Sequence, residues 1–169
     1  FYIVRASIPA FQIISRRYCM TATSIMDPHP TVVKPTDIIK TAIGYIMDNR
    51  YRNLPVVDDD GHYLGSFGVT CLLKNVLPKA VLIKKGLTSV PFVQQSLSDL
   101  HNRLRELENE PISMCMNTEA QTVPPDMPLV QTLLILYQNR DSLPVVDPDS
   151  GKLLGVISYW DAGEKILSA

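Results

Sequence analysis

The chain has 169 residues, of which 46% are hydrophobic and 20% are charged, and its formal net charge is −1. This length fits one compact domain or two small, closely packed halves, and the composition is typical of a soluble globular protein. A net charge so close to zero gives no basic field that would favour nucleic acid as a partner. The 3 cysteines lie far apart and form neither a metal-binding nor a disulfide pattern, which indicates a reducing cytoplasm.

Residues 1–23 are expected to form an N-terminal extension that packs on the domain or on a partner. They are largely apolar, but a membrane span needs about 18 uninterrupted apolar residues. Arg5, Pro9 and Gln12 interrupt this stretch, and the pattern of a secretory signal is missing. We therefore predict no membrane span, with a helix lying on a membrane surface as the alternative.

An internal duplication organises the rest of the chain. The run Leu-Pro-Val-Val-Asp occurs twice, from Leu54 to Asp58 and from Leu143 to Asp147. Each copy is followed by a glycine turn and then by a Leu-Gly pair, which ends at Gly65 or Gly155. Length differences between the copies fall in the connections, where insertions are tolerated. The chain is therefore predicted to fold as two equivalent repeats.

The first repeat predicts the order strand, helix, strand, strand, helix. A short strand at Thr31 to Val33 precedes a helix that Thr36 or Asp37 is expected to cap. The spacing of apolar residues gives this helix a buried face of Ile38, Ile39, Ala42, Ile43 and Ile46. A hairpin follows, with strands from Leu54 to Val57 and from Tyr63 to Val69. The closing helix carries Leu72, Leu73, Val76 and Leu77.

The second repeat predicts the same order. A strand at Gln121 to Val123 precedes a helix with Pro128 in its first turn. The buried face of that helix is predicted to consist of Leu129, Val130, Leu133, Leu136 and Tyr137. The next strands end at Val146 and extend from Leu153 to Ile157, and the last helix begins at Asp161.

A further helix is predicted in the linker, residues 79–111, between the repeats. Its apolar stripe is narrow and consists of Leu97, Leu100, Leu104 and Leu107. Ser96 or Ser98 is expected to start the helix, and Pro111 marks its end. The stripe fits either a connecting helix that covers the domain or an oligomer contact, because it resembles a coiled-coil seam.

These residues resemble the cystathionine-β-synthase (CBS) domain family, specifically the tandem pair known as a Bateman module. The resemblance extends from about Ile25 to Leu167, except for the central insertion. It depends on the duplication, the order of elements, the Leu-Pro-Val-Val-Asp strand and the Gly-Val-Ile-Ser-Tyr-Trp-Asp ending from Gly155 to Asp161. It implies an α+β fold of two β-α-β-β-α repeats, packed about a pseudo-two-fold axis with an intervening linker helix. The repeats would span residues 24–78 and 112–169, and residues 24–169 would form one module.

In this family, clefts between the repeats bind adenosine-containing ligands, and the modules usually dimerise and act as sensors. The resemblance therefore implies a regulatory, homodimeric module that binds AMP, ADP, ATP or S-adenosylmethionine, needs no cofactor, and acts on an unknown effector protein. A ligand-independent module for dimerisation and protein interaction is the alternative. An enzyme is not expected, because the sequence has no Gly-rich phosphate loop, paired carboxylates or metal signature.

The ending of the second repeat predicts a ligand site. Asp161, at the junction of a strand and a helix, can accept hydrogen bonds from both hydroxyls of a ribose. Ser158 can donate to an α-phosphate, which the amides at the helix start also favour. The alternative is that Asp161 only caps the last helix. The resemblance places the adenine against Thr122, Val123, Pro144 and Val145.

The equivalent ending of the first repeat lacks both polar groups. Gly68 stands in place of the hydroxyl residue and Cys71 in place of the acid. A thiol is a weak donor and a poor partner for a ribose diol. We therefore expect this cleft to be empty or to accept a different ligand, with Thr70 a partial substitute for the missing hydroxyl.

Cationic side chains are the remaining requirement of a phosphate site. Arg52 precedes the first apolar hairpin strand, and pseudo-symmetry is expected to bring it across to the ligand held by Asp161. The counterpart of Arg52 in the second repeat is Asp141, which would repel a phosphate. The weaker candidates are Arg50, Arg140 and His29. A solvated side chain without a ligand is the alternative for each of them.

Overall fold

The computed structural model describes residues 20–77, 79, 82, 96–139 and 141–168. Most of the predicted N-terminal extension therefore lies outside the described residues. In chain order the elements are η1 (Ala22–Ser24), α1 (Ile39–Asn49), β1 (Asn53–Val57), β2 (Tyr63–Gly68), α2 (Val69–Val76), α4 (Leu97–Leu107), η3 (Ile112–Met114), α5 (Leu129–Asn139), β3 (Leu143–Val146), β4 (Leu153–Ile157) and α6 (Tyr159–Leu167). Within the described residues, no helix is long and apolar enough to cross a membrane.

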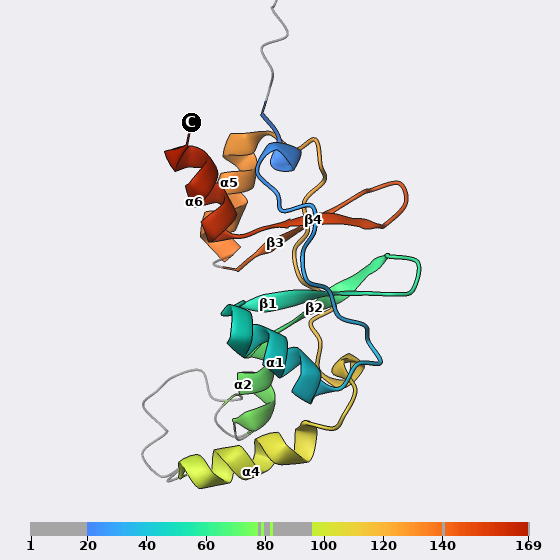
Figure 1. The fold of residues 1–169 in the computed structure, drawn as a ribbon, viewed down its shortest axis with the longest axis vertical. Helices are drawn as coiled ribbons and strands as arrows, with labels where there is room; N and C mark the ends of the chain where they lie inside the picture. Colours follow the sequence, from blue (N-terminus) through green and yellow to red (C-terminus); the bar gives the residue numbers. More distant parts are fainter. Residues whose placement is uncertain (1–19, 78, 80–81, 83–95, 140, 169) are drawn as a thin grey trace, which may run out of the picture.

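The two repeats form two stacked units, each an antiparallel hairpin with its own helices. Strands β1 and β2 pair in one sheet, and β3 and β4 pair in the other. Figure 1 shows the hairpins one above the other, with α5 and α6 beside the upper one and α1 and α2 beside the lower one. The linker helix α4 lies at the far end of the lower unit. This arrangement confirms the predicted α+β fold of two repeats.

The first predicted strand of each repeat is much shorter than expected. Val33 makes a single parallel bridge to Val56, and Val123 makes the equivalent bridge to Val145. Prolines flank the first segment on both sides and directly follow the second, and a proline cannot donate to a strand ladder. Each segment therefore pairs at one residue instead of forming a strand.

Reciprocal contacts relate the two units by a pseudo-two-fold axis. Backbone hydrogen bonds of 2.8 and 3.0 Å join Asp27 to Val156 on β4. The equivalent residues, Asn117 and Ser66 on β2, are joined by bonds of 2.8 and 2.9 Å. The tips of the two hairpins also exchange two backbone hydrogen bonds, both 3.0 Å long. The same contact thus occurs once in each direction, as a two-fold axis requires.

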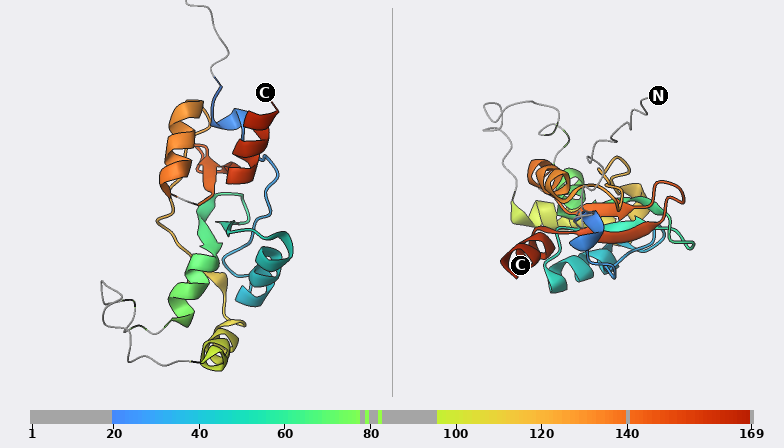
Figure 2. Two further views of the ribbon diagram at one scale, coloured as in Figure 1. Left: turned by 90° about the vertical axis from the view of Figure 1, so that its left-hand side faces the viewer. Right: turned by 90° about the horizontal axis from the view of Figure 1, so that it is seen from above.

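Each repeat completes its hydrophobic core with a segment that precedes the other repeat in the sequence. Ala22 and Ile25 pack in the core of the second repeat, together with Leu143 and Ile157. Conversely, Ile112 packs in the core of the first repeat. The chain after η1 then crosses from the upper unit to the lower one (Figures 1 and 2). Each predicted repeat, residues 24–78 or 112–169, therefore begins with a segment that packs in the core of the other repeat.

The duplicated Leu-Gly pair is explained by these crossings. A β-carbon on Gly65 would lie 2.5 Å from the backbone oxygen of Asn117, and one on Gly155 would lie 2.5 Å from that of Asp27. Real β-carbons do not approach a backbone oxygen so closely. Glycine at these two positions lets each crossing segment pair with the neighbouring strand.

Helix α1 is capped by the linker and not by its own side chains. Its N-cap is Ile38, and the carboxylate of Asp37 instead accepts the Lys34 amide at 2.8 Å. The first two amides of the helix donate to the backbone oxygens of Glu110 and Glu108, at 2.9 and 2.8 Å. The prediction that Thr36 or Asp37 caps this helix is therefore wrong, because a distant segment satisfies the free amides.

Helix α4 is a connecting helix packed on the first repeat. It begins at Ser96, as predicted, with a capping box between Ser96 and Asp99. The helix contacts α2, and Arg103 donates to the backbone oxygen of Val76 at 3.2 Å. Leu107 packs against the core of the first repeat, whereas Leu97 is exposed. Leu107 is therefore covered within the chain, whereas no side chain of α4 is fully buried.

The predicted face of α5 is partly wrong. Val130 and Tyr137 were expected in the core, but they are 79% and 75% exposed. Leu136 is buried and Leu129 and Leu133 pack against the core, as predicted, whereas the buried Thr132 was not predicted. The Thr132 hydroxyl donates to the backbone oxygen of Pro128 at 3.1 Å, which allows a polar residue to occupy the core. An apolar count alone could not identify that position.

Candidate functional site

Ser158 and Asp161 lie at the N-terminus of α6, directly after β4. Ser158 is the N-cap, so the helix begins two residues earlier than predicted. Its backbone amide and hydroxyl donate to Asp161 Oδ2 at 2.8 and 2.6 Å, and its Oγ accepts the Asp161 amide at 3.2 Å. The capping role of Asp161 is therefore confirmed. Within the described residues, no hydrogen bond uses the second carboxylate oxygen, Oδ1, of Asp161.

A cavity of about 740 Å³ opens beside this helix end and is called the Asp161 cleft below. Ser158, Asp161 and Trp160 line it from the second repeat. From the first repeat, the lining includes Thr31 and Pro55. The cleft is therefore built from both repeats, and its size is that of a small-molecule site.

The predicted adenine-contact residues do not line this cleft. Val123, Pro144 and Val145 are buried in the second repeat, and Thr122 is exposed elsewhere. Of their counterparts in the first repeat, Pro55 lines the cleft, and its neighbour Leu54 and the residue Thr31 line it as well. The pseudo-two-fold axis explains this exchange, because it turns the start of α6 toward the strands of the other repeat.

Arg52 lines the Asp161 cleft, as the pseudo-symmetry argument expects for it. Arg50 also lines the cleft, at the left-handed C-cap of α1 with φ 55°. His29 is exposed and is not part of the lining. Arg140 falls outside the described residues. Among the described residues, the cleft thus has two cationic side chains, both from the same loop.

Sequence reasoning missed several aromatic and polar residues of the cleft. Tyr51 lines it, and its hydroxyl lies 3.4 Å from that of Thr31. Tyr159 also lines it, and its hydroxyl is held by the backbone oxygen of Leu136 at 2.8 Å. Trp160 is 86% exposed at the cleft margin. Applying the two-fold exchange to the predicted adenine contacts would have identified Pro55, but not Thr31.

A family model described as the CBS domain matches residues 22–77 and 111–167. The chain belongs to the CBS domain family. The two matches, one in each repeat, make it a tandem CBS pair. No curated protein matches the chain.

Solved CBS-pair structures share the fold over most of the chain. The CBS-pair protein CBSX2 from Arabidopsis thaliana is 22% identical, with a TM-score of 0.67 over 88% of this chain and 94% of its own. A structure of CBSX2 in complex with AMP is 22% identical, with a TM-score of 0.63 over 88% and 97%. A CBS domain-containing protein of unknown function from Bacillus anthracis is 13% identical, with a TM-score of 0.65 over 88% and 94%.

The first CBS repeat has its own, smaller cavity of about 390 Å³, called the Gly68 cleft below. Gly68 is the N-cap of α2 and provides no side chain to that helix end. A β-carbon there would lie 2.4 Å from the backbone oxygen of Arg52, so a serine cannot fit without movement. Cys71 is buried, with its Sγ 3.8 Å from the backbone oxygen of Ser66. This cleft therefore lacks the hydroxyl and carboxylate pair of the Asp161 cleft.

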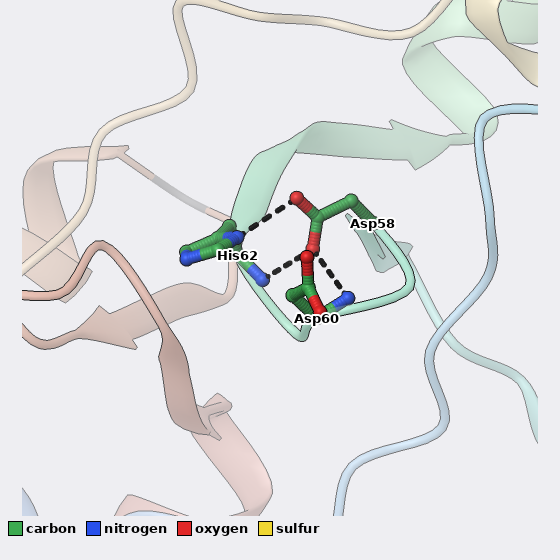
Figure 3. Close-up of side chains that lie close together, drawn as sticks. All are labelled: Asp58, Asp60 and His62. Carbon is green, nitrogen blue, oxygen red and sulfur yellow. Dashed lines mark hydrogen bonds and ion pairs between the residues drawn. The ribbon is translucent and has the colours of Figure 1, made fainter.

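The hairpin turn of the first CBS repeat brings together Asp58, Asp60 and His62, whose ligand atoms lie within 4.8 Å of one another (Figure 3). Asp58 Oδ1 accepts the amides of Asp60 and His62 at 3.0 and 2.8 Å, and Oδ2 lies 2.8 Å from His62 Nδ1. The hydrogen bond from the His62 side chain lowers the pKa of Asp58. These bonds build the turn, and the described residues add no further sign of an ion.

Proposed function

We propose that this CBS pair is a regulatory module that binds an adenosine-containing ligand in the Asp161 cleft. AMP, ADP, ATP and S-adenosylmethionine are the candidate ligands. The observation that carries the proposal is the Asp161 carboxylate, whose Oδ1 is unused in the described residues beside a cleft of about 740 Å³. The module is not an enzyme in this proposal, needs no cofactor, and acts through a separate effector.

The residues of the cleft match the parts of a nucleotide. Asp161 Oδ1 is available to a ribose hydroxyl, while Oδ2 stays in the capping box. The start of α6 favours an anion, and Arg52 lines the same cleft as a cation for phosphate. Thr31 is a polar partner from the other repeat, and Leu54 and Pro55 provide apolar cover for a base. The AMP complex of CBSX2, which has this fold, supports the choice of ligand class.

Regulation follows from the shared lining of the cleft. A ligand held by Asp161 and by Thr31 or Arg52 touches both repeats at once. Such a ligand favours whichever packing of the repeats gives it more contacts, and it shifts the population accordingly. An effector that senses the relative position of the repeats would then respond to ligand concentration.

The proposal is tested by thermal shift with the four candidate ligands, using two matched variants. A ligand at about 100 times its dissociation constant stabilises a protein by about 2.7 kcal/mol. Asp161→Ala removes the capping box and the proposed ribose contact together. Asp99→Ala removes the similar capping box of α4, where Ser96 donates to Asp99 Oδ2 at 2.9 Å, far from the cleft.

Both variants are expected to lower the Tm of the free protein, because each loses a helix cap. Only Asp161→Ala is expected to weaken the ligand, by about tenfold or more, because a charged hydrogen bond contributes about 1.5–3 kcal/mol. Equal ligand affinity in the two variants would contradict the proposal. So would the absence of a shift with every ligand, once mass spectrometry shows that the purified protein carries no bound nucleotide.

A second candidate function, a ligand-independent dimerisation module, is favoured by one observation. Large apolar side chains are exposed on both α5 and α6, namely Val130, Leu134, Tyr137, Trp160, Ile166 and Leu167. Exposed apolar area of this kind is typical of a protein interface. Unchanged self-association and effector binding in Asp161→Ala, with no ligand response in the wild type, would favour this candidate.

A further inference from the structure

Arg52 is shared by the two clefts. It lines the Asp161 cleft and the Gly68 cleft, at the boundary between them. Its repeat counterpart, Asp141, lines only the Gly68 cleft. The pseudo-two-fold axis thus places opposite charges at equivalent positions, on the same cavity.

Asp141 is a half-buried carboxylate that benefits from a nearby cation. Burial raises the pKa of Asp141. Two contacts partly offset this effect: the Ser142 amide donates to the carboxylate at 3.0 Å, and the charge of Arg52 lies nearby. The other titratable side chains that line the cavity are Cys71, Lys74, Cys115 and Glu119. Tyr63 also faces Asp141, and burial raises its pKa to about 12. Arg52 is therefore one of two cations, with Lys74, that line the cavity of Asp141 in the described residues.

A phosphate in the Asp161 cleft would compete for the same guanidinium. A charged side chain gains most from the partner that is closest and least hydrated. If Arg52 turns to the phosphate, Asp141 keeps its charge in a half-buried position with weaker compensation, which costs free energy. The free energy that Arg52 contributes to phosphate binding is therefore reduced by the interaction with Asp141 that it gives up.

We propose that Asp141 is a positioning residue for Arg52. Asp141 competes with the phosphate of a bound ligand for the Arg52 guanidinium. This competition sets how strongly the Asp161 cleft prefers phosphorylated over unphosphorylated adenosine ligands. The inference rests on the proposed function. An adenosine ligand without phosphate does not draw on Arg52, so its affinity is independent of Asp141. Removal of the Asp141 charge releases Arg52 and strengthens the binding of AMP alone.

A proton linkage follows from the same competition. When Arg52 leaves for a phosphate, the pKa of Asp141 rises further, because the cation that opposed the effect of burial is withdrawn. AMP binding then takes up protons at acidic pH, between the lower pKa of the free protein and the higher pKa of the complex. Neutral adenosine causes no such uptake.

The experiment measures AMP and adenosine affinities by titration calorimetry at neutral pH, for the wild type, Asp141→Asn and Glu119→Gln. Glu119 is exposed on the same cavity, so its variant makes the same charge change without the proposed contact to Arg52. We expect Asp141→Asn to bind AMP about tenfold tighter, the equivalent of one pKa unit of interaction, and adenosine unchanged. Glu119→Gln is expected to match the wild type for both ligands.

A double-mutant cycle and a measurement on the wild type complete the test. In an Arg52→Gln background, Asp141→Asn is expected to leave the AMP affinity unchanged. Wild-type titrations at about pH 4, roughly two units below the second pKa of the phosphate, in buffers of different ionisation enthalpy, are expected to show proton uptake with AMP beyond any seen with adenosine. This last readout needs no variant, so it remains decisive if Asp141→Asn does not fold.

Three outcomes overturn the inference. The first is that Asp141→Asn and Glu119→Gln bind AMP with equal affinity, which would show that Asp141 has no specific role. The second is that the wild type binds AMP without proton uptake beyond any seen with adenosine. In both cases the proposed function stands, because AMP still binds. The absence of AMP and adenosine binding in the wild type overturns the proposed function and this inference together.

Discussion

Gly155 allows the crossing segment to pair with β4, and its replacement by alanine tests that packing. In the structure, a β-carbon at this position would lie 2.5 Å from the backbone oxygen of Asp27 and 2.9 Å from the sulfur of Met26. The same Asp27 oxygen accepts the Val156 amide at 3.0 Å, and the Asp27 amide donates to the Val156 oxygen at 2.8 Å. The new methyl group must therefore push away the segment that makes both bonds.

The expected cost follows from these contacts. Two backbone hydrogen bonds contribute about 1 kcal/mol each to stability, net of hydration. Overpacking in a rigid site adds about 1–3 kcal/mol. Gly155→Ala should therefore lower the free energy of unfolding by about 3–5 kcal/mol.

Urea unfolding followed by far-ultraviolet circular dichroism measures this loss. Gly44→Ala is the matched control, because a β-carbon on Gly44 in α1 has no neighbour within 4 Å. Alanine is favoured over glycine by about 1 kcal/mol inside a helix, so the control should be stabilised. The reasoning is refuted if Gly155→Ala costs less than about 1 kcal/mol, or if the two substitutions change stability in the same direction.

Two further substitutions test other parts of the fold. Ile112→Ala should lower the free energy of unfolding by about 2–5 kcal/mol, because Ile112 is fully buried in the core of the first repeat. The control Ile166→Ala, at an exposed position of α6, should change it by less than about 0.5 kcal/mol. Similar urea midpoints for the two variants would argue against the exchange of segments. Tyr63→Phe should not reduce stability at neutral pH, because the Tyr63 hydroxyl is buried without a hydrogen-bond partner among the described residues. Above the ordinary tyrosine pKa of about 10, the unfolded wild type loses this proton first, since the folded pKa is about 12, so wild-type stability should fall with rising pH more steeply than that of Tyr63→Phe. A Phe variant clearly less stable at neutral pH would show that the hydroxyl has a partner.

Local patterns in the sequence predicted the elements well, because they depend on near neighbours. The hairpin strands and the Ser96 start of α4 follow from apolar spacing, glycine turns and capping residues. Thr132 is an exception, since its hydroxyl is satisfied by its own helix and the residue enters the core. The spacing of apolar residues could not identify a buried position that a polar residue occupies.

The cleft was only partly predictable, for a reason that concerns symmetry. A repeat identifies equivalent residues, such as Thr31 with its second-repeat counterpart, but not which copy faces a given helix end. Ser158 and Asp161 were found because the motif is contiguous. Their partners Thr31 and Pro55 belong to the other repeat and approach through the pseudo-two-fold axis. The caps of α1, which come from Glu108 and Glu110, were missed for the same reason.

The exchange of core segments bears on the order in which this chain can fold. As the polypeptide is synthesised, the first repeat lacks Ile112 until the ribosome has passed the linker. The segment with Ala22 and Ile25 emerges early but must wait for β4, which ends at Ile157, before its own core can close. Contacts between such distant parts of a chain slow folding, because a long loop must close before they form. Neither core is complete on the ribosome until most of the chain has emerged, so both are expected to consolidate late and together.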